Sequence, residues 1–599
     1  MKKRGSRECQ KNPQCNHLAG ILSYREERQM AITLKQVDVA VIGLGAAGGV
    51  AVLPLARAGL RVAGIEAGTW MDPRSFRPDE VHNNVRGLVT TGTKVKREVP
   101  TFRTSDGTPA RQAANHPMMN AVGGTSIHYH AQSWRLNPWD FQVRSRATKR
   151  YGASSIPAGT TLEDWPITYD DLEPYYDIVE YEIGVSGKAG NIRGAIDSRG
   201  NIFEGPRQRE YPMPPLRDTE FTELMMRAGK KLGWHPFRGP AAINSQPYRG
   251  RPACAYHGYC DRGGCHVSAK NSTAVTTIPA AQKTRNFTIF DNAQVTRILT
   301  GDNGKVTGVL YLREGKEYFQ PARAVLLASY TYENTRLLLL SKSKAFPNGL
   351  SNNHGQVGKH YFGHWDAQAG VGCTALFPFD LNTWYGAIAQ GVVVDDWADD
   401  NFDHSGLGFI GGYSLHAYHE KHPIASAAMN TFGRAPQWGA KWKAFIHENA
   451  GRWTSAYLQG NSFPYENTYL DLDPEVRDPL GDPVCRVTSG PKQNEPRAAT
   501  FASAKMEEWF RAAGAIEVIR NVGNGPALST HAFGGTRMGL SPETNVVDAW
   551  GFSHEAPNLG ILGGSVMGTN GARNPTLTLQ ALAWRTAERL VKDWKKIAG

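Results

Sequence analysis

Three glycines and one glutamate near the start of the chain have the types and order of a dinucleotide-binding site. Gly43, Gly45 and Gly48 form a G-x-G-x-x-G pattern, and Glu66 follows farther along. Gly43 allows a tight turn, Gly45 lets a pyrophosphate approach the backbone, and Gly48 lets a helix pack closely on a strand. An acid at the position of Glu66 can hydrogen-bond a ribose hydroxyl. This chemistry predicts that the chain binds a dinucleotide.

The surrounding sequence supplies the elements that such a site needs. Val37 to Ile42 is a short apolar run typical of a buried parallel strand, Ala46 to Ala58 is typical of a helix, and Arg61 to Ile65 is a second strand that ends at Glu66. The free N–H groups at the start of the helix would face the phosphates. A glycine-rich turn in an ordinary α/β sheet is the alternative, but it does not explain the glutamate.

Length and composition are those of a globular protein of several domains. The chain has 599 residues, 64 of them glycine, and a net charge of +12 that is spread along the chain. No Lys/Arg-rich block with interleaved aromatic residues occurs, so nucleic acid is disfavoured as a partner. No apolar run approaches the roughly 20 residues that span a bilayer. Residues 1–29 are polar and basic without the apolar core of a signal peptide, so residues 1–34 are expected to be a disordered or non-native extension.

Farther along, the pattern predicts further strands and helices. Asn286 to Leu312 alternates like a hairpin, Ala324 to Ala328 is typical of a buried strand, and Thr331 to Leu340 of a helix. Residues His360 to His447 are predicted to form an antiparallel sheet with long loops, and Pro575 to Lys595 a terminal helix. Nucleotide-binding pieces therefore alternate with other material along the chain.

Four motifs, in this order, make the chain resemble the GMC (glucose–methanol–choline) flavoprotein oxidoreductases. They are GLGAAGG with Glu66, VGGTSIHYH from Val122, THAFGGTRMG from Thr530, and PNLGILGGSVMGTNGARNPTLTLQALA from Pro557. Within the family the chain most resembles the flavoprotein subunits of gluconate 2-dehydrogenase-type sugar dehydrogenases, on the strength of its cysteine cluster and of the stretches ASYTYENTRLLLLS and GQVGKHYFGH. The resemblance implies that the dinucleotide is FAD.

The resemblance also implies an α/β fold, α+β overall, with a Rossmann-like FAD-binding domain of the GMC type and a substrate domain built from an antiparallel sheet and helices. Both domains are expected to be discontinuous. The FAD-binding domain is predicted over 35–145, 235–345 and 525–599, and the substrate-binding domain over 146–234 and 346–524.

Two residues occupy the family's catalytic positions. The resemblance implies that His531 is the base that takes the hydroxyl proton while hydride leaves the substrate carbon, a task that suits an imidazole near neutral pH. A core histidine is the alternative. Asn574 matches a second active-site position, where its amide would orient the substrate oxygen. The alternative for Asn574 is a helix cap before Pro575.

Other residues are expected around the cofactor. The resemblance suggests a covalent bond between His128 and FAD, with a non-covalent histidine beside the flavin as the alternative. Thr576 would begin a helix whose N-terminus faces the end of the flavin where negative charge develops. The remaining predicted contacts are Gly123, Gly124, Thr125, Ser126, Gly564 and Ser565.

Cys254, Cys260 and Cys265 form a cluster with His257 between the first two. Some sugar dehydrogenases of the family hold a [3Fe–4S] cluster on three thiolates, so the resemblance implies this or another iron–sulfur cluster here. A zinc site that uses His257, a disulfide and free thiols are the alternatives.

Together these features predict an FAD-dependent dehydrogenase that oxidises a hydroxyl of a sugar, sugar acid or polyol. Electrons would pass through the cluster to a cytochrome or quinone, with a small subunit and a haem-containing cytochrome subunit as partners. An O₂-using sugar or glycoside 3-oxidase and a non-catalytic flavin-binding redox or assembly module are the alternatives. The expected location is periplasmic, or at the membrane through partner subunits, with the cytoplasm as the alternative.

Overall fold

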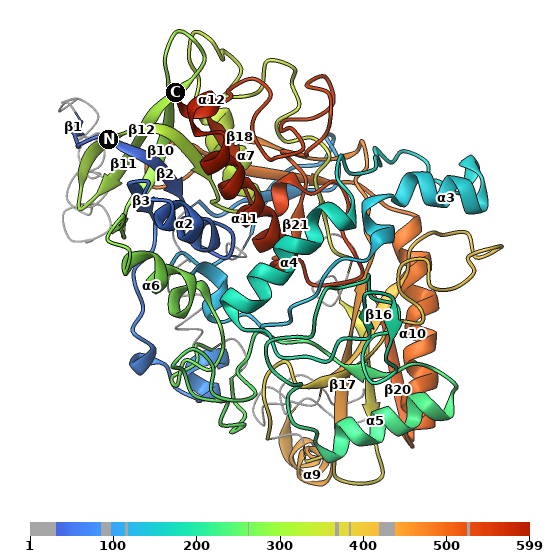
Figure 1. The fold of residues 1–599 in the computed structure, drawn as a ribbon. Helices are drawn as coiled ribbons and strands as arrows, with labels where there is room; N and C mark the ends of the chain where they lie inside the picture. Colours follow the sequence, from blue (N-terminus) through green and yellow to red (C-terminus); the bar gives the residue numbers. More distant parts are fainter. Residues whose placement is uncertain are drawn as a thin grey trace, which may run out of the picture.

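A computed structural model describes residues 31–85, 98–113, 118–260, 263–365, 370–382, 385–418, 438–523 and 528–599 (Figure 1). Most of the predicted N-terminal extension, residues 1–30, lies outside these ranges. Trp384, the first residue of the aromatic stretch Trp384 to Gln390, also lies outside them. Among the described residues, no helix combines the length and the apolar composition needed to cross a bilayer. The fold is α/β with two large sheets, as the sequence predicted.

The first sheet contains the predicted dinucleotide unit. Its strand order is β10-β11-β12-β2-β3-β9, and β1 and β22 also pair with β12. The strands are β1 (Ile32–Thr33), β2 (Val37–Ile42), β3 (Val62–Ile65), β9 (Phe287–Phe290), β10 (Gln294–Thr300), β11 (Val306–Arg313), β12 (Lys316–Leu327) and β22 (Leu559–Ile561). The strands β22, β12, β2, β3 and β9 run parallel, which brings three distant parts of the chain into one sheet.

One sequence prediction about this sheet is wrong in part. The hairpin is formed by β10 and β11, which pair antiparallel, whereas β9 pairs in parallel with β3. The alternation of apolar residues in Asn286 to Leu312 identified the strands, but it carried no information on which neighbour each strand would choose.

Helices cover the first sheet because its strands are apolar on both faces. Helix α2 (Gly48–Arg57) packs between α6 (Thr277–Gln282) and α11 (Thr576–Lys592), and α11 also contacts α4 (Tyr169–Ile183). Figure 1 shows these four helices side by side. The first turn of α2 consists of small residues, so it lies directly against the loop that follows β2.

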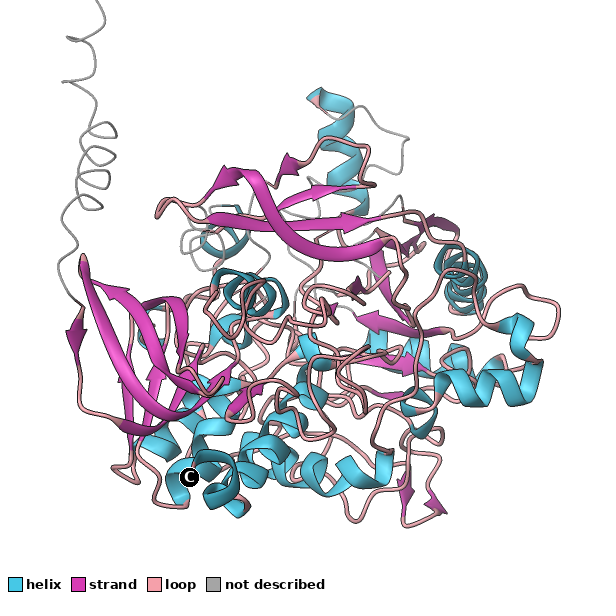
Figure 2. Cartoon of the chain, turned by 90° about the horizontal axis from the view of Figure 1, so that it is seen from above, coloured by secondary structure: helices cyan, strands magenta, loops and turns pink. Residues whose placement is uncertain are grey.

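The second sheet is antiparallel, with the order β20-β14-β17-β16-β15-β8. Its strands are β8 (Phe237–Arg238), β14 (Val371–Leu376), β15 (Gly391–Val394), β16 (Tyr413–Tyr418), β17 (Trp453–Gly460) and β20 (Glu517–Val522). Helix α10 (Asn494–Ala512) packs on this sheet and against α5 (Glu220–Lys231). Figure 2 shows the two large sheets apart from each other, with the C-terminus among the helices.

A four-stranded sheet of order β18-β19-β4-β5 lies beside α7 (Thr331–Leu340). Its strands are β4 (Thr101–Arg103), β5 (Arg111–Gln112), β18 (Thr468–Arg477) and β19 (Pro483–Ser489). The smaller elements are β6 (Asn191–Ile192), β7 (Ala195–Ile196), β13 (Phe362–Gly363), β21 (Ala532–Phe533), α3 (Val143–Tyr151), α9 (Gly439–Asn449) and α12 (Trp594–Ala598), with short helical turns η2 (Pro73–Ser75), η3 (Val81–Val85), η4 (Gly124–Ile127), η5 (Pro138–Phe141), η6 (Ala153–Ser155), η7 (Thr273–Val275) and η9 (Gly564–Val566). The predicted domain boundaries stay a prediction.

Candidate active site

The loop between β2 and α2 has a shape that only glycine permits at two of its positions. Gly43 has φ +85°, and a Cβ there would lie 2.6 Å from the carbonyl oxygen of Ala328. A Cβ on Gly48 would lie 1.9 Å from the carbonyl oxygen of Gly43. The loop therefore turns tightly against β12 and brings the first turn of α2 onto it, which is the arrangement that cradles a pyrophosphate.

The second glycine-rich turn, Gly123 to Ser126, lies against the first. A Cβ on Gly124 would meet the Cα of Gly45 at 2.8 Å. Ser126 closes the turn by donating its hydroxyl to the carbonyl oxygen of Gly123 at 2.5 Å. The two turns are far apart in sequence, yet they form one surface.

Glu66 stabilises the loop that forms part of this surface. Its side chain is only 6% exposed, and its carboxylate accepts the N–H of Leu44 and the N–H of Gly68, each at 2.9 Å. A carboxylate has about four acceptor positions, so two backbone bonds leave capacity for a ribose hydroxyl. Glu66 therefore has a structural task in this loop, and its contact with a ribose hydroxyl stays a prediction.

One cavity gathers most of the predicted cofactor residues. Its lining includes Gly43, Gly45, Glu66, Gly124, Thr125, Ser126, His531, Gly564 and Thr576. The predicted residues Gly48, Gly123, His128, Ser565 and Asn574 do not line it. Each of these five is next in sequence to a lining residue, and the Ser565 hydroxyl accepts a hydrogen bond from the Asn334 amide. A glycine cradle, a helix N-terminus and a buried acid around one cavity are a donor set that fits FAD.

His531 contacts two other side chains at this cavity. Its Nδ1 lies 2.9 Å from Nδ1 of His364, and its Nε2 lies 3.4 Å from the amide nitrogen of Asn574. His364 is 4% exposed, and its Nε2 lies 3.1 Å from the carbonyl oxygen of Gly571. The two residues that the sequence singled out for catalysis are therefore in direct contact, and His364, which it did not single out, contacts the other ring nitrogen of His531.

Asn574 is not the helix cap that was the alternative interpretation. Helix α11 begins at Thr576 after Pro575, and no side chain caps it. The Asn574 carbonyl oxygen instead accepts the indole N–H of Trp134 at 3.1 Å. The amide nitrogen is thereby turned toward His531, where a substrate oxygen could also reach it.

His128 follows the second glycine turn directly. Its backbone N–H donates to Thr125 at 3.1 Å, so it ends η4 just outside the cavity lining. A covalent bond from His128 to the cofactor stays a prediction.

The three clustered cysteines do not form the predicted metal site. Cys254, Cys260 and Cys265 are partly buried, and none of the three is in a disulfide with another described residue. Among the described residues, no group of three or more His, Cys, Asp or Glu side chains is arranged to hold a metal ion. The Cys260 thiol instead lies 3.3 Å from the carbonyl oxygen of Gly258. These positions do not fit an iron–sulfur cluster or a zinc site, so no step of the reaction is derived through one.

The stretch His360 to Trp365, for which the sequence is equally consistent with sugar stacking and with core packing, packs into the protein. Burial lowers the pKa of His360 to about 3, and its ring nitrogens contact Thr161 and Gln356. The Trp365 indole N–H donates to the carbonyl oxygen of Val522 at 3.0 Å. From this stretch, the side chain of His364 contacts His531.

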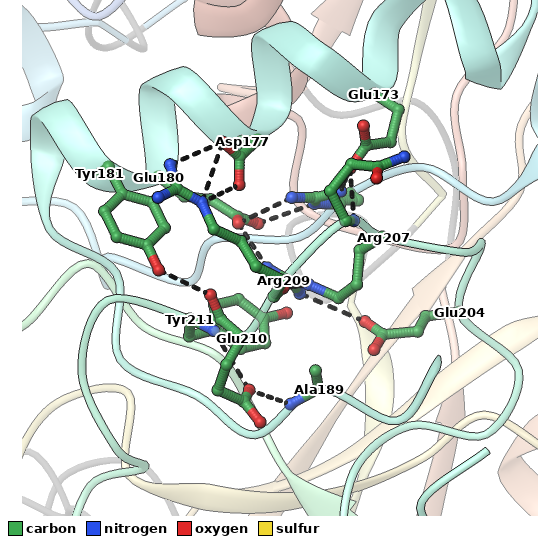
Figure 3. Close-up of polar contacts among 12 residues, drawn as sticks. Glu173, Asp177, Glu180, Tyr181, Ala189, Glu204, Arg207, Arg209, Glu210 and Tyr211 are labelled. Atoms are coloured by element: carbon green, nitrogen blue, oxygen red, sulfur yellow. Dashed lines mark hydrogen bonds and ion pairs between the residues drawn. The ribbon is translucent and has the colours of Figure 1, made fainter. Parts of the chain in front are cut away.

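Residues next to the site are held by buried ion pairs. Arg573 bonds Asp395 at 2.7 Å and Asp399 at 2.6 Å, directly before Asn574 in the chain. Arg135, directly after Trp134, pairs with Glu173 and Glu180 of α4. Figure 3 shows the rest of that cluster, in which Glu180 also faces Arg207, and Arg207 faces Glu204.

Comparisons with known proteins identify the family of the chain. Models of the GMC oxidoreductase family match residues 162–366 and 464–583. The chain is 31% identical to a gluconate 2-dehydrogenase flavoprotein of Pantoea cypripedii, over 95% of this chain and 96% of that protein. It is 27% identical to the fructose dehydrogenase large subunit of Gluconobacter japonicus, over 93% and 98% of the two chains.

Solved structures agree on the fold. A formate oxidase of Aspergillus oryzae aligns with a TM-score of 0.59 at 14% identity, covering 95% of this chain and all of that one. Pyridoxine 4-oxidase aligns with a TM-score of 0.57 at 16% identity, covering 92% of this chain and 99% of that one. The match to the gluconate 2-dehydrogenase flavoprotein runs along nearly the whole chain, and two family models match within it. These matches establish that this protein belongs to the GMC oxidoreductase family.

Proposed function

We propose that the protein is an FAD-dependent dehydrogenase that oxidises a hydroxyl of a sugar, sugar acid or polyol. The observation that carries the proposal is the pairing of His531 with Asn574 beside the glycine-cradled cavity. Relatives named as gluconate 2-dehydrogenase, fructose dehydrogenase and 2-methyl-1,2-propanediol dehydrogenase support this substrate class, because all three names specify a hydroxylated substrate.

FAD would be held by the loop after β2, by the turn Gly123 to Ser126 and by Glu66. When bound, FAD accepts a hydride from the substrate carbon. His531 accepts the hydroxyl proton at an imidazole nitrogen, which is general-base catalysis near neutral pH. Asn574 donates its amide N–H to the same hydroxyl oxygen and orients it. The N-terminus of α11, with Thr576 on the cavity, faces negative charge that develops in the site.

The names of the same relatives also bear on the electron acceptor. We favour a dehydrogenase with a protein or quinone acceptor over an O₂-using oxidase, because the gluconate 2-dehydrogenase flavoprotein is 31% identical to this chain and the two relatives named as oxidases are 27% and 28% identical. Relatives named paromamine 6'-oxidase and 6'''-hydroxyparomomycin C oxidase keep the oxidase as the second candidate. The relative named as a large subunit supports a smaller partner subunit, and we propose a haem-containing subunit and a periplasmic or membrane-surface location with it.

Anaerobic flavin bleaching tests the proposal. The purified holoprotein is mixed with sugars, polyols and aldonic acids, and flavin absorbance is followed. One class should bleach the flavin, and the His531→Ala variant should bleach about 10²- to 10⁴-fold more slowly while it retains FAD, since this is the usual contribution of a general base. A matched control is His235→Gln, because His235 is a surface residue that pairs with Asp396.

Two further readings complete the experiment. Slow return of colour in air identifies a dehydrogenase, and fast return identifies the oxidase. Bound FAD that no compound on the panel bleaches would refute the carbohydrate substrate and favour a non-catalytic flavin module.

A further inference from the structure

The catalytic histidine lies inside a chain of four hydrogen-bonding side chains. Trp134 contacts Asn574 at 3.1 Å, Asn574 contacts His531 at 3.4 Å, and His531 contacts His364 at 2.9 Å. His364 contacts the carbonyl oxygen of Gly571 at 3.1 Å. Both ends of the chain are groups with a single hydrogen-bonding role, because an indole N–H only donates and a peptide carbonyl only accepts.

The two ends determine every bond between them. Because the carbonyl of Gly571 accepts, Nε2 of His364 carries the proton, and Nδ1 of a neutral His364 is an acceptor. Nδ1 of His531 must then be the donor in the contact between the two histidines. This leaves Nε2 of His531 without a proton.

The opposite end of the chain gives the same answer. The indole N–H of Trp134 donates to the Asn574 carbonyl oxygen, so the amide NH₂ faces His531. An NH₂ group needs an acceptor, and an unprotonated Nε2 is one. The tautomer derived from His364 and the tautomer derived from Trp134 agree.

We infer that His364 is a positioning residue that fixes His531 in the tautomer with Nδ1 protonated, so that Nε2 is the bare base that faces the substrate. The inference deepens the proposed alcohol oxidation and rests on it for its catalytic meaning. In that reaction the Asn574 N–H turns from Nε2 to the substrate oxygen, the substrate O–H bond breaks and an Nε2–H bond forms, while hydride passes from carbon to FAD. His531 then carries protons on both nitrogens, and His364 still accepts from its Nδ1.

The backbone holds the two histidines in register. Strand β13 pairs antiparallel with β21, so that Phe362 lies opposite Phe533 and Gly363 opposite Ala532. The N–H of His364 donates to the carbonyl oxygen of His531 at 3.2 Å. The His364 ring also packs edge-on against Phe533, with 5.1 Å between centroids. The imidazole thus has little freedom to turn away from His531.

Three substitutions at His364 separate its two hydrogen bonds. His364→Asn keeps an acceptor near the Nδ1 position, His364→Gln keeps a donor near the Nε2 position, and His364→Phe keeps neither. We expect anaerobic flavin reduction to slow about 10- to 100-fold in the Gln and Phe variants, the usual loss when the group that orients a functional histidine is removed. The Asn variant should retain a rate several-fold higher than both. KM should change little, because His364 does not line the cavity.

A matched control comes from a second buried histidine. His404 contacts the carbonyl oxygen of Gly411 through Nε2 at 2.7 Å and Tyr151 through Nδ1 at 3.2 Å, far along the chain from the cavity residues. His404→Phe removes a similar pair of bonds and should lower stability without slowing flavin reduction.

A spectroscopic measurement tests the tautomer without turnover. Histidine labelled with ¹⁵N in the holoprotein reports which ring nitrogen carries the proton, and the His531 signals are assigned by their loss in His531→Ala. Wild type should show Nδ1 protonated and Nε2 bare, and His364→Phe should lose this preference. Wild-type flavin reduction in His364→Phe, or a wild-type His531 protonated at Nε2, would overturn the inference. If no compound bleaches wild type, the proposed function fails, but the ¹⁵N spectra still decide the tautomer.

Discussion

The most direct test of the cofactor site is Glu66→Gln. The wild-type carboxylate accepts two backbone N–H groups, one from Leu44 in the glycine loop and one from Gly68, each at 2.9 Å. An amide has one oxygen and one NH₂ group, so one of these N–H groups loses its acceptor and faces another donor. The lost bond is to a charged group in a buried place, and such bonds contribute about 1.5–3 kcal/mol.

This loss falls on the loop that receives the pyrophosphate. If the whole loss appears as cofactor affinity, about 1.5–3 kcal/mol weakens FAD binding about 10- to 150-fold. The assay is titration of the apoprotein with FAD, followed by quenching of flavin fluorescence. Asp38→Asn is the matched control, because Asp38 also accepts a backbone N–H from the neighbouring strand, that of Arg61, at the opposite end of β2. Its contacts are exposed, so the change should cost about 0–1 kcal/mol of stability and leave FAD affinity unchanged.

Equal FAD affinities of Glu66→Gln and wild type, with intact folding, would refute the reasoning that this carboxylate shapes the loop for the cofactor. Equal losses in Glu66→Gln and Asp38→Asn would show a general effect on the sheet instead.

Three further predictions use other parts of the structure. Gly48→Ala should abolish FAD binding, since its Cβ would lie 1.9 Å from a loop carbonyl oxygen, whereas Gly107→Ala has open space and should bind FAD normally in the same titration. Trp134→Phe keeps the aromatic packing but frees the Asn574 amide to turn. Flavin reduction should therefore slow about 10-fold, which is the equivalent of one hydrogen bond. An unchanged rate would show that the amide is held by other contacts. Burial lowers the pKa of His416 to about 3, so between about pH 6.5 and 3 the unfolded chain binds a proton that the native state does not, and stability falls as the pH is lowered. From pH 7 to pH 5 the His416 contribution to the free energy of unfolding falls by about 2 kcal/mol. It is measured as the difference in the pH dependence of urea unfolding between wild type and His416→Gln. Identical pH dependence of the two proteins would contradict the prediction.

The sequence by itself determined the dinucleotide unit and the family. Strand Val37–Ile42 has its predicted bounds, and α7 runs from Thr331 to Leu340 as predicted. These elements are local, because their apolar pattern and their glycines act within a few residues of one another. Motifs that share a chemical task, such as those that carry His531 and Asn574, could also be identified, since each consists of contiguous residues.

Tertiary structure alone decided how these pieces meet. The contact between Gly45 and Gly124, the parallel pairing of β9 with β3, and the approach of His364 to His531 all join segments that are far apart in the chain. The strands that align the two histidines are only two residues long, too short to leave a periodic pattern. Spacing along the chain does not determine where three thiols point, so the sequence could not decide whether Cys254, Cys260 and Cys265 are arranged to hold a metal. Local pattern thus specified which elements form, and packing among distant elements determined the neighbours of His531.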